Sequence, residues 1–81
     1  MDVVFLDPPR KGLDQPLIES LLKLQPKKIV YVSCNPASLA KDLAELTQKY
    51  QVKYIQPIDM FPYTSHVESV TMLELKKPQN H

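Results

Sequence analysis

Two apolar runs, each followed by a proline-marked helix start, most constrain how this chain can fold. The first run, 3–6, ends at Asp7-Pro8-Pro9 ahead of a helical pattern, and the second, 29–32, leads into Cys34-Asn35-Pro36. Continuous apolar runs of this length are typical of parallel strands that are covered on both faces. Proline ends a strand and favours the first turn of a helix. The pattern therefore predicts strands alternating with helices.

The remaining residues complete this order. Asp14 is expected to cap one helix, with Pro16 in its first turn, and Asn35 to cap a second that starts at Pro36. The expected buried faces of these helices consist of Leu17, Ile18, Leu21 and Leu22 in the first and Leu39, Ala40, Leu43, Ala44 and Leu46 in the second. Strands are predicted at 2–6, 28–33, 50–60 and about 67–75. In the third of these, Tyr50, Val52 and Tyr54 are expected to lie on one face.

The order strand, helix, strand, helix, strand, strand predicts an α/β fold. By the right-handed crossover rule the sheet is mostly parallel, and the last strand runs antiparallel. This is the pattern of half of a doubly wound, Rossmann-like domain, in which the strand at 2–6 would have a further partner beyond it. Residues 1–77 are expected to form one part of such a domain, and 78–81 are expected to form a flexible tail.

Composition excludes several classes of function. With 43% hydrophobic residues and a formal net charge of +1, the 81-residue chain is neither disordered nor a strongly basic polyanion binder. One cysteine and two distant histidines provide neither a disulfide nor metal-ligand spacing, and they indicate a reducing, cytoplasmic setting. No apolar run could cross a membrane. The single glycine, Gly12, excludes a glycine-rich nucleotide loop, so a nucleotide-like cofactor would be held mainly upstream.

Three polar residues are candidates for a site at the carboxyl ends of the strands. Asp7 ends the first strand, Cys34 lies between the second strand and a helix N-terminus that favours a thiolate, and Glu68 begins an otherwise apolar strand. A carboxylate in that last position is costly unless it is paired, exposed or used. Each residue alone has an ordinary structural explanation, but their shared position predicts a reactive site.

Three segments resemble the RNA uracil-5-methyltransferase family. They are Asp7-Pro8-Pro9-Arg10-Lys11-Gly12, the stretch 32–40 around Ser33-Cys34-Asn35-Pro36, and the stretch 59–68 from Asp59 through Phe61-Pro62-Tyr63 to Glu68. They occur in the family's order, and the resemblance covers residues 6 to about 75. It implies the C-terminal part of a Rossmann-like class I methyltransferase domain. This part would belong to a longer enzyme that transfers a methyl group from S-adenosyl-L-methionine to C5 of uridine in RNA.

The resemblance also implies roles for the candidate residues. Cys34 corresponds to the nucleophile, Glu68 to the general base, and Asp7 to a cofactor-binding aspartate; no metal ligand is implied. Most of the cofactor-binding elements would lie upstream of residue 2, so the isolated chain is expected to be inactive. The RNA substrate would be ribosomal or transfer RNA, and Met60, Val67 and the stretch 61–65 resemble the 23S ribosomal branch slightly more closely.

Two alternatives remain open at this stage. A methyltransferase that acts on an amino group of a base also carries an Asp-Pro-Pro segment, but it usually places an aromatic residue where Arg10 stands, and it needs no thiol. The other alternative is a non-catalytic piece that associates with a second copy through the open edge of its first strand. The apolar run 3–6 would favour such an association.

Overall fold

The helices and strands follow one another in the predicted order. The computed structural model describes residues 2–59 and 67–77. Its elements are β1 (Val3–Leu6), α1 (Gln15–Leu24), β2 (Lys28–Ser33), α2 (Pro36–Leu46), β3 (Tyr50–Asp59) and β4 (Val67–Leu75). The bounds of β2 and β4 agree with the prediction, and β1 begins one residue later than expected. The segment between the last two strands, 60–66, and the predicted tail at 78–81 lie outside the described residues.

Both helices begin as their capping residues predict. The Asp14 carboxylate accepts a hydrogen bond from the Leu17 amide at 3.3 Å, and the Asn35 side chain accepts one from the Ala37 amide at 3.0 Å. These bonds satisfy amides in the first turn that have no partner within the helix. The start of α2, which directly follows Cys34, is therefore fixed by local sequence.

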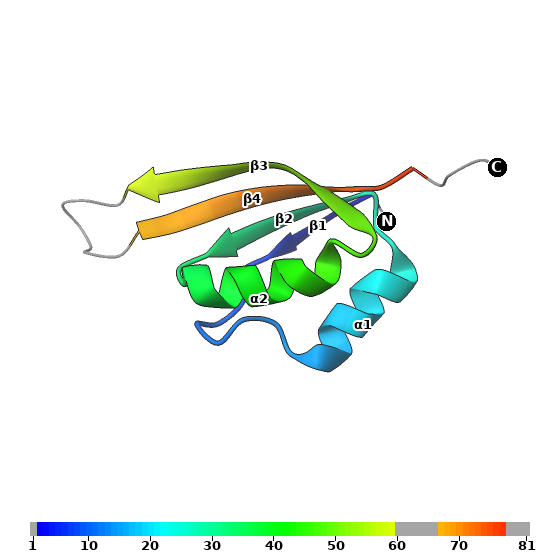
Figure 1. The fold of residues 1–81 in the computed structure, drawn as a ribbon, viewed down its shortest axis with the longest axis horizontal. Helices are drawn as coiled ribbons and strands as arrows, with labels where there is room; N and C mark the ends of the chain where they lie inside the picture. Colours follow the sequence, from blue (N-terminus) through cyan, green and yellow to red (C-terminus); the bar gives the residue numbers. More distant parts are fainter. Residues whose placement is uncertain (1, 60–66, 78–81) are drawn as a thin grey trace.

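The sheet is mixed, and its strand order is β1-β2-β4-β3. β1 pairs with β2 in parallel, whereas β4 runs antiparallel to both β2 and β3. The last strand therefore inserts between its two predecessors instead of extending the sheet at the edge (Figure 1). β1, β2 and β3 share one direction, which confirms the prediction of a Rossmann-like sheet whose last strand is antiparallel.

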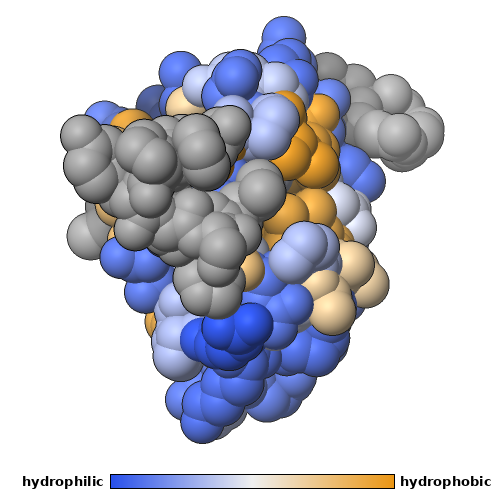
Figure 2. Space-filling model, turned by 90° about the vertical axis from the view of Figure 1, so that its left-hand side faces the viewer, coloured by the Kyte–Doolittle hydropathy of each residue, from blue (hydrophilic) through white to orange (hydrophobic). Residues whose placement is uncertain are grey.

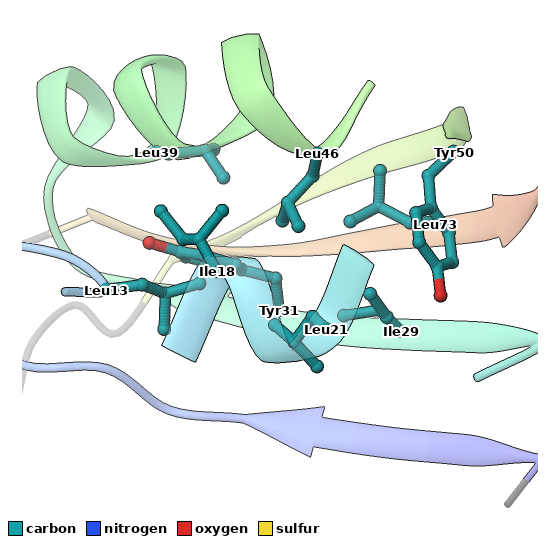
Figure 3. Packing of buried hydrophobic residues seen from close by; sticks show 9 residues of the cluster. All are labelled: Leu13, Ile18, Leu21, Ile29, Tyr31, Leu39, Leu46, Tyr50 and Leu73. Carbon is teal, nitrogen blue, oxygen red and sulfur yellow. The ribbon is translucent and has the colours of Figure 1, made fainter. Parts of the chain in front are cut away.

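The hydrophobic core lies between one face of the sheet and the two helices. Alternate residues of the central strands, Ile29 and Tyr31 of β2 and Leu73 of β4, are fully buried on this face. Figure 3 shows their side chains gathered with those of the helices and Tyr50. Burial of such side chains is the main stabilising contribution available to a chain of this size.

The buried helix faces are narrower than the sequence predicts. Leu39 and Leu46 are buried as expected, but Ala40 and Ala44 are exposed. Leu17 is 40% exposed and borders an open depression beside the edge strand β1. Each helix contacts a single sheet face, so only the residues nearest that face lose contact with water.

A β-bulge overturns the predicted alternation in β3. Val52 pairs with Leu73, but the next paired residue of β3, Tyr54, is opposite Met72. The additional residue Lys53 shifts the register, which moves Tyr54 to the other face and leaves it 52% exposed. The prediction that Tyr50, Val52 and Tyr54 share a face is therefore wrong for Tyr54.

The second face of the sheet carries exposed apolar side chains. Both helices lie on the same side of the sheet, and within residues 2–59 and 67–77 no element covers the other side (Figure 1). Phe5, which pairs with Val30, is 76% exposed there. β1 also forms one edge of the sheet, as the sequence predicts.

Two buried tyrosines make the stability of the fold sensitive to alkaline pH. The hydroxyl of Tyr31 donates a hydrogen bond to Asp42, and that of Tyr50 donates one to the Pro26 carbonyl. Burial raises the pKa of both phenols, and the bond to Asp42 raises the pKa of Tyr31 further. The folded state therefore keeps these protons at a pH where unfolded tyrosines ionise.

The free energy of unfolding is accordingly expected to be unaffected by these groups below about pH 10 and to fall as the pH rises above it, because the unfolded chain releases phenol protons that the folded chain keeps. Urea unfolding between pH 8 and 11 measures this slope. Tyr31→Phe should make it shallower, because one of the two linked protons is removed. Identical slopes for the two proteins would contradict the assignment.

Candidate functional site

The strand pairings bring the three predicted site residues to the same end of the sheet. Leu6 pairs with Tyr31, so Asp7 follows β1 at the level where β2 is about to end. Ser33 pairs with Ser69, so Cys34, which follows Ser33, and Glu68, which precedes Ser69, lie at the same end of this pair of strands. This end lies on the left of Figure 1 and faces the viewer in Figure 2, where hydrophobic residues are exposed among hydrophilic ones.

Glu68 lies on the face of the sheet opposite the helices. Thr71 and Leu73 of β4 are buried toward the helices, so alternation along the strand places Glu68 on the other face. Cys34 follows Ser33, the last residue of β2, in a bend where strand alternation no longer applies. Both Cys34 and Glu68 are half-buried. The thiol and the carboxylate therefore belong to the same end of the sheet.

Short-range hydrogen bonds hold the turn that carries Cys34. The Ser33 hydroxyl accepts a hydrogen bond from the Asn35 amide at 3.1 Å and donates one to the Asn35 carbonyl at 3.0 Å. Asn35 in turn caps α2. Cys34 thus lies between two residues fixed by their own side chains, at the end of α2 where the helix dipole favours an anion.

Asp7 is exposed and borders a depression beside β1. Its lining includes Leu6, Gly12 and Leu13, and its volume is about 230 Å³. A carboxylate at the rim of an apolar hollow suits a ligand with both polar and apolar parts. The volume is below the roughly 300–1,000 Å³ of sites that enclose a drug-sized ligand, so these residues could hold part of such a ligand.

The loop from Asp7 to Leu13 is fastened to α2. The Arg10 carbonyl accepts hydrogen bonds from the Asn35 side chain at 3.0 Å and from the Ser38 hydroxyl at 2.5 Å. The Gly12 amide donates to the Pro9 carbonyl at 2.8 Å, which closes a turn inside the loop. The segment that contains Asp7 is therefore attached to the helix that follows Cys34.

Sequence reasoning missed one residue of this arrangement, Asp42. Its side chain is completely buried and accepts hydrogen bonds from the Leu13 amide and the Tyr31 hydroxyl. The available signal was its position on α2, because Asp42 is three residues after Leu39 and four before Leu46, both of which are buried. An acidic residue on the apolar stripe of a helix indicates a buried polar contact.

None of the helices in the described part of the chain is long and apolar enough to cross a membrane. Residues 2–59 and 67–77 contain no group of three His, Cys, Asp or Glu side chains placed to hold a metal ion. His66, which the sequence placed in the loop before Glu68, lies outside the part of the chain that the structure describes.

Comparison with known proteins assigns this arrangement to a class. A crystal structure of the Pyrococcus abyssi tRNA (uracil-54, C5)-methyltransferase, in complex with S-adenosyl-L-homocysteine, matches with a TM-score of 0.79 and 47% identity. The match covers 89% of this chain and 18% of that one. The fold is thus that of a portion of a methyltransferase, as the sequence predicted.

Sequence relatives agree. An uncharacterized RNA methyltransferase of Listeria innocua is 62% identical over 73 residues, and one of Bacillus anthracis is 57% identical over 75 residues. These alignments cover 90% and 93% of this chain but only 16% of each relative. The model of the tRNA (uracil-5-)-methyltransferase family matches residues 1–76. The chain belongs to this family, which confirms the resemblance seen in its three motifs.

Proposed function

We propose that this chain forms the C-terminal part of the catalytic domain of a longer enzyme, which methylates C5 of uridine in RNA with S-adenosyl-L-methionine. Family membership supports the reaction class. The observation that carries the proposal is the register of β2 and β4, in which Ser33 pairs with Ser69, so that the predicted nucleophile, Cys34, and the predicted base, Glu68, are each one residue from this pair. Two reactive groups at the same end of adjacent strands can act on the two adjacent ring carbons of one pyrimidine.

The role of Cys34 follows from the weak reactivity of uracil. C5 of uracil is a poor nucleophile, and S-adenosyl-L-methionine, when bound, supplies a methyl group as an electrophile. The Cys34 thiolate adds to C6, so that an S–C6 bond forms and the ring becomes an enolate with electron density at C5. The position at the start of α2 favours the thiolate that this addition needs.

Glu68 completes the reaction as a general base. Once C5 has gained its methyl group, it carries that group and a proton. The Glu68 carboxylate accepts the C5 proton, the C–H electrons restore the ring double bond, and the S–C6 bond breaks to release the Cys34 thiolate. Nucleophile and base therefore work at opposite ends of the same C5–C6 bond, in agreement with their positions next to the paired residues Ser33 and Ser69.

Asp7 is the residue of this chain that we assign to the cofactor. Its carboxylate can accept hydrogen bonds from polar groups of S-adenosyl-L-methionine while Leu6 and Leu13 line the adjoining depression. The remaining cofactor contacts would come from upstream residues, and we expect no turnover from the isolated 81 residues.

Asp7→Asn in the intact enzyme is expected to raise the KM for S-adenosyl-L-methionine by about tenfold, because a hydrogen-bonded carboxylate contributes on the order of 1.5–3 kcal/mol. Asp2→Asn is the matched control, since Asp2 is an exposed aspartate just before β1, at the opposite end of the strand. Steady-state kinetics at saturating RNA measure both variants. An unchanged KM for Asp7→Asn would remove Asp7 from the cofactor site.

The RNA target is proposed as 23S ribosomal RNA, with transfer RNA as the alternative. Met60, Val67 and the stretch 61–65 resemble the ribosomal branch slightly more closely, whereas the family model and the solved neighbour carry transfer-RNA names. Incubating the intact enzyme with S-adenosyl-L-methionine and each RNA, followed by nucleoside analysis, tests both the reaction and the target. We expect 5-methyluridine from one RNA. A methylated base nitrogen, or no methylation of either RNA, would overturn the proposed function.

A further inference from the structure

Asp42 is a charged group that the described fold has enclosed. Its side chain has no exposure to solvent, and one oxygen, Oδ2, accepts hydrogen bonds from the Leu13 amide at 2.8 Å and from the Tyr31 hydroxyl at 2.5 Å. Burial of a carboxylate is costly unless it is paired and hydrogen-bonded. A buried acid that accepts hydrogen bonds from two segments distant in sequence fixes the position of one segment relative to the other.

The two segments joined by Asp42 both lead to predicted site residues. Leu13 ends the loop that begins at Asp7, and Tyr31 lies on β2 three residues before Cys34. Asp42 itself belongs to α2, the helix that begins after Cys34. Through hydrogen bonds to one carboxylate oxygen, Asp42 therefore connects the loop that contains Asp7 to β2 and α2, the strand and the helix on either side of Cys34.

Lys41 forms an ion pair with the second oxygen of the Asp42 carboxylate. Its ammonium lies 3.0 Å from Asp42 Oδ1 and 3.3 Å from the Leu13 carbonyl, to which it donates a hydrogen bond. The Lys41 side chain is 57% exposed, so it places a positive charge between the buried acid and solvent. Leu13 is thus held at both its amide and its carbonyl by two consecutive residues of α2.

Gly12 shows how closely the loop fits this carboxylate. Its φ of +90° favours glycine, and a Cβ added there would lie 2.8 Å from Asp42 Oδ2 and 3.2 Å from Ser38 Cβ. Any side chain at this position would push the loop away from α2. The only glycine of the chain is therefore placed where a side chain would collide with the buried acid.

We propose that Asp42 is a positioning residue, which sets the place of the Asp7 loop relative to Cys34 and so determines the affinity for the methyl donor. The inference rests on the proposed function, because it takes Asp7 as a cofactor residue. Asp42 touches neither the substrate nor the cofactor and acts through Leu13 and the loop. Asp42 thereby links the affinity for the methyl donor to the position of β2, the strand that precedes Cys34.

Asp42→Asn in the intact enzyme tests this role. The amide keeps one oxygen for Leu13 and Tyr31, but it places an NH2 group against the Lys41 ammonium or turns that group toward the loop. We expect the dissociation constant for S-adenosyl-L-homocysteine to rise by about tenfold or more, the effect of a displacement on the order of 1 Å. Isothermal titration also gives the stoichiometry, which a merely unfolded fraction would lower without changing the dissociation constant.

Two further variants keep the test decisive if Asp42→Asn folds poorly. Gly12→Ala displaces the loop from the other side of the same contact and should raise the dissociation constant in the same way. Glu19→Gln is the matched control, since it removes the same charge from an exposed position on α1 and should leave the affinity unchanged. Unchanged affinity in both Asp42→Asn and Gly12→Ala would overturn the proposal.

Hydrogen exchange of the Leu13 amide provides a readout that does not depend on catalysis. Asp42→Asn should accelerate this exchange selectively, because the bond to Oδ2 is weakened, and unaltered exchange would contradict the role of Asp42. Failure of the proposed function would appear separately, as the absence of 5-methyluridine with the unaltered enzyme. An active enzyme with unchanged Leu13 exchange and ligand affinity would instead reject the positioning role alone.

Discussion

Replacing Cys34 by serine in the intact enzyme is expected to lower the rate of 5-methyluridine formation on the order of 10⁴-fold or more, as for the loss of an essential nucleophile. A serine hydroxyl is almost entirely un-ionised at neutral pH, and the start of α2 stabilises an anion by only about 0.3–1 kcal/mol. The helix can therefore favour a thiolate but cannot generate an alkoxide. Without addition at C6, C5 stays too unreactive to accept a methyl group.

Single-turnover assays with radiolabelled methyl donor measure this loss. Cys34→Ala is the companion variant and should be equally inactive, because neither side chain can add to C6. Both variants should bind S-adenosyl-L-homocysteine with the affinity of the unaltered enzyme, since the loop of Asp7 is held by bonds in which the Cys34 side chain takes no part. A rate within tenfold of the unaltered enzyme in either variant would exclude a covalent role for Cys34.

Glu68→Gln is expected to lower turnover by about 10²–10⁴-fold, the usual contribution of a general base. Unlike loss of Cys34, it should also cause a covalent complex of enzyme and RNA to accumulate. Glutamine cannot accept the C5 proton, so the ring double bond is not restored and the S–C6 bond remains. The two residues therefore have opposite effects on the intermediate, although both variants lose activity.

Denaturing gel electrophoresis of the enzyme with labelled RNA detects this complex. Glu74→Gln is the control, because Glu74 lies on the same strand and is half-buried like Glu68, but it pairs with Lys28 at the other end of β2. It should neither trap RNA nor slow turnover. Adding Cys34→Ala to Glu68→Gln should abolish the trapped complex. Loss of turnover without any trapped complex would assign Glu68 a role other than proton removal.

Local sequence was sufficient to predict where most elements begin. The caps Asp14 and Asn35 and their following prolines act within one helical turn, so the helix starts could be derived without tertiary contacts. The apolar run of β2, bounded by Pro26 and Asn35, likewise defined that strand. Contacts between segments distant in sequence were harder to predict. The sequence predicted an antiparallel last strand, but the insertion of β4 between β2 and β3 follows from pairings across the chain.

The errors have the same origin. Tyr54 continues an alternating pattern, and only pairing with β4 reveals that Lys53 is bulged out and that the face changes. Leu17 has the spacing of a core residue, but it lies beside the edge strand, where no described segment covers it. Asp42 resembles an ordinary solvated acid until Leu13 and Tyr31 are brought to it. In each case the decisive neighbour is distant in sequence.

The candidate site was predictable to a similar extent. The position of Cys34 between a strand and a helix follows from adjacent residues, whereas its position at the same end of the sheet as Glu68 depends on a register between segments more than thirty residues apart. The motifs indicated the residues and their expected chemistry through family resemblance. The sheet supplies the spatial relation on which the proposed mechanism depends.

Mapping the covalent bond to RNA tests the central claim most directly. Uridine with fluorine at C5 can take up the nucleophile at C6 but has no C5 proton to lose, so the enzyme should remain attached. Incubation of the intact enzyme with such RNA and S-adenosyl-L-methionine, followed by trypsin and nuclease digestion, should yield the peptide 29–41 carrying the modified nucleotide on Cys34. An enzyme that methylates uridine-containing RNA but gives no adduct with the fluorinated RNA, or an adduct on another residue, would contradict the account.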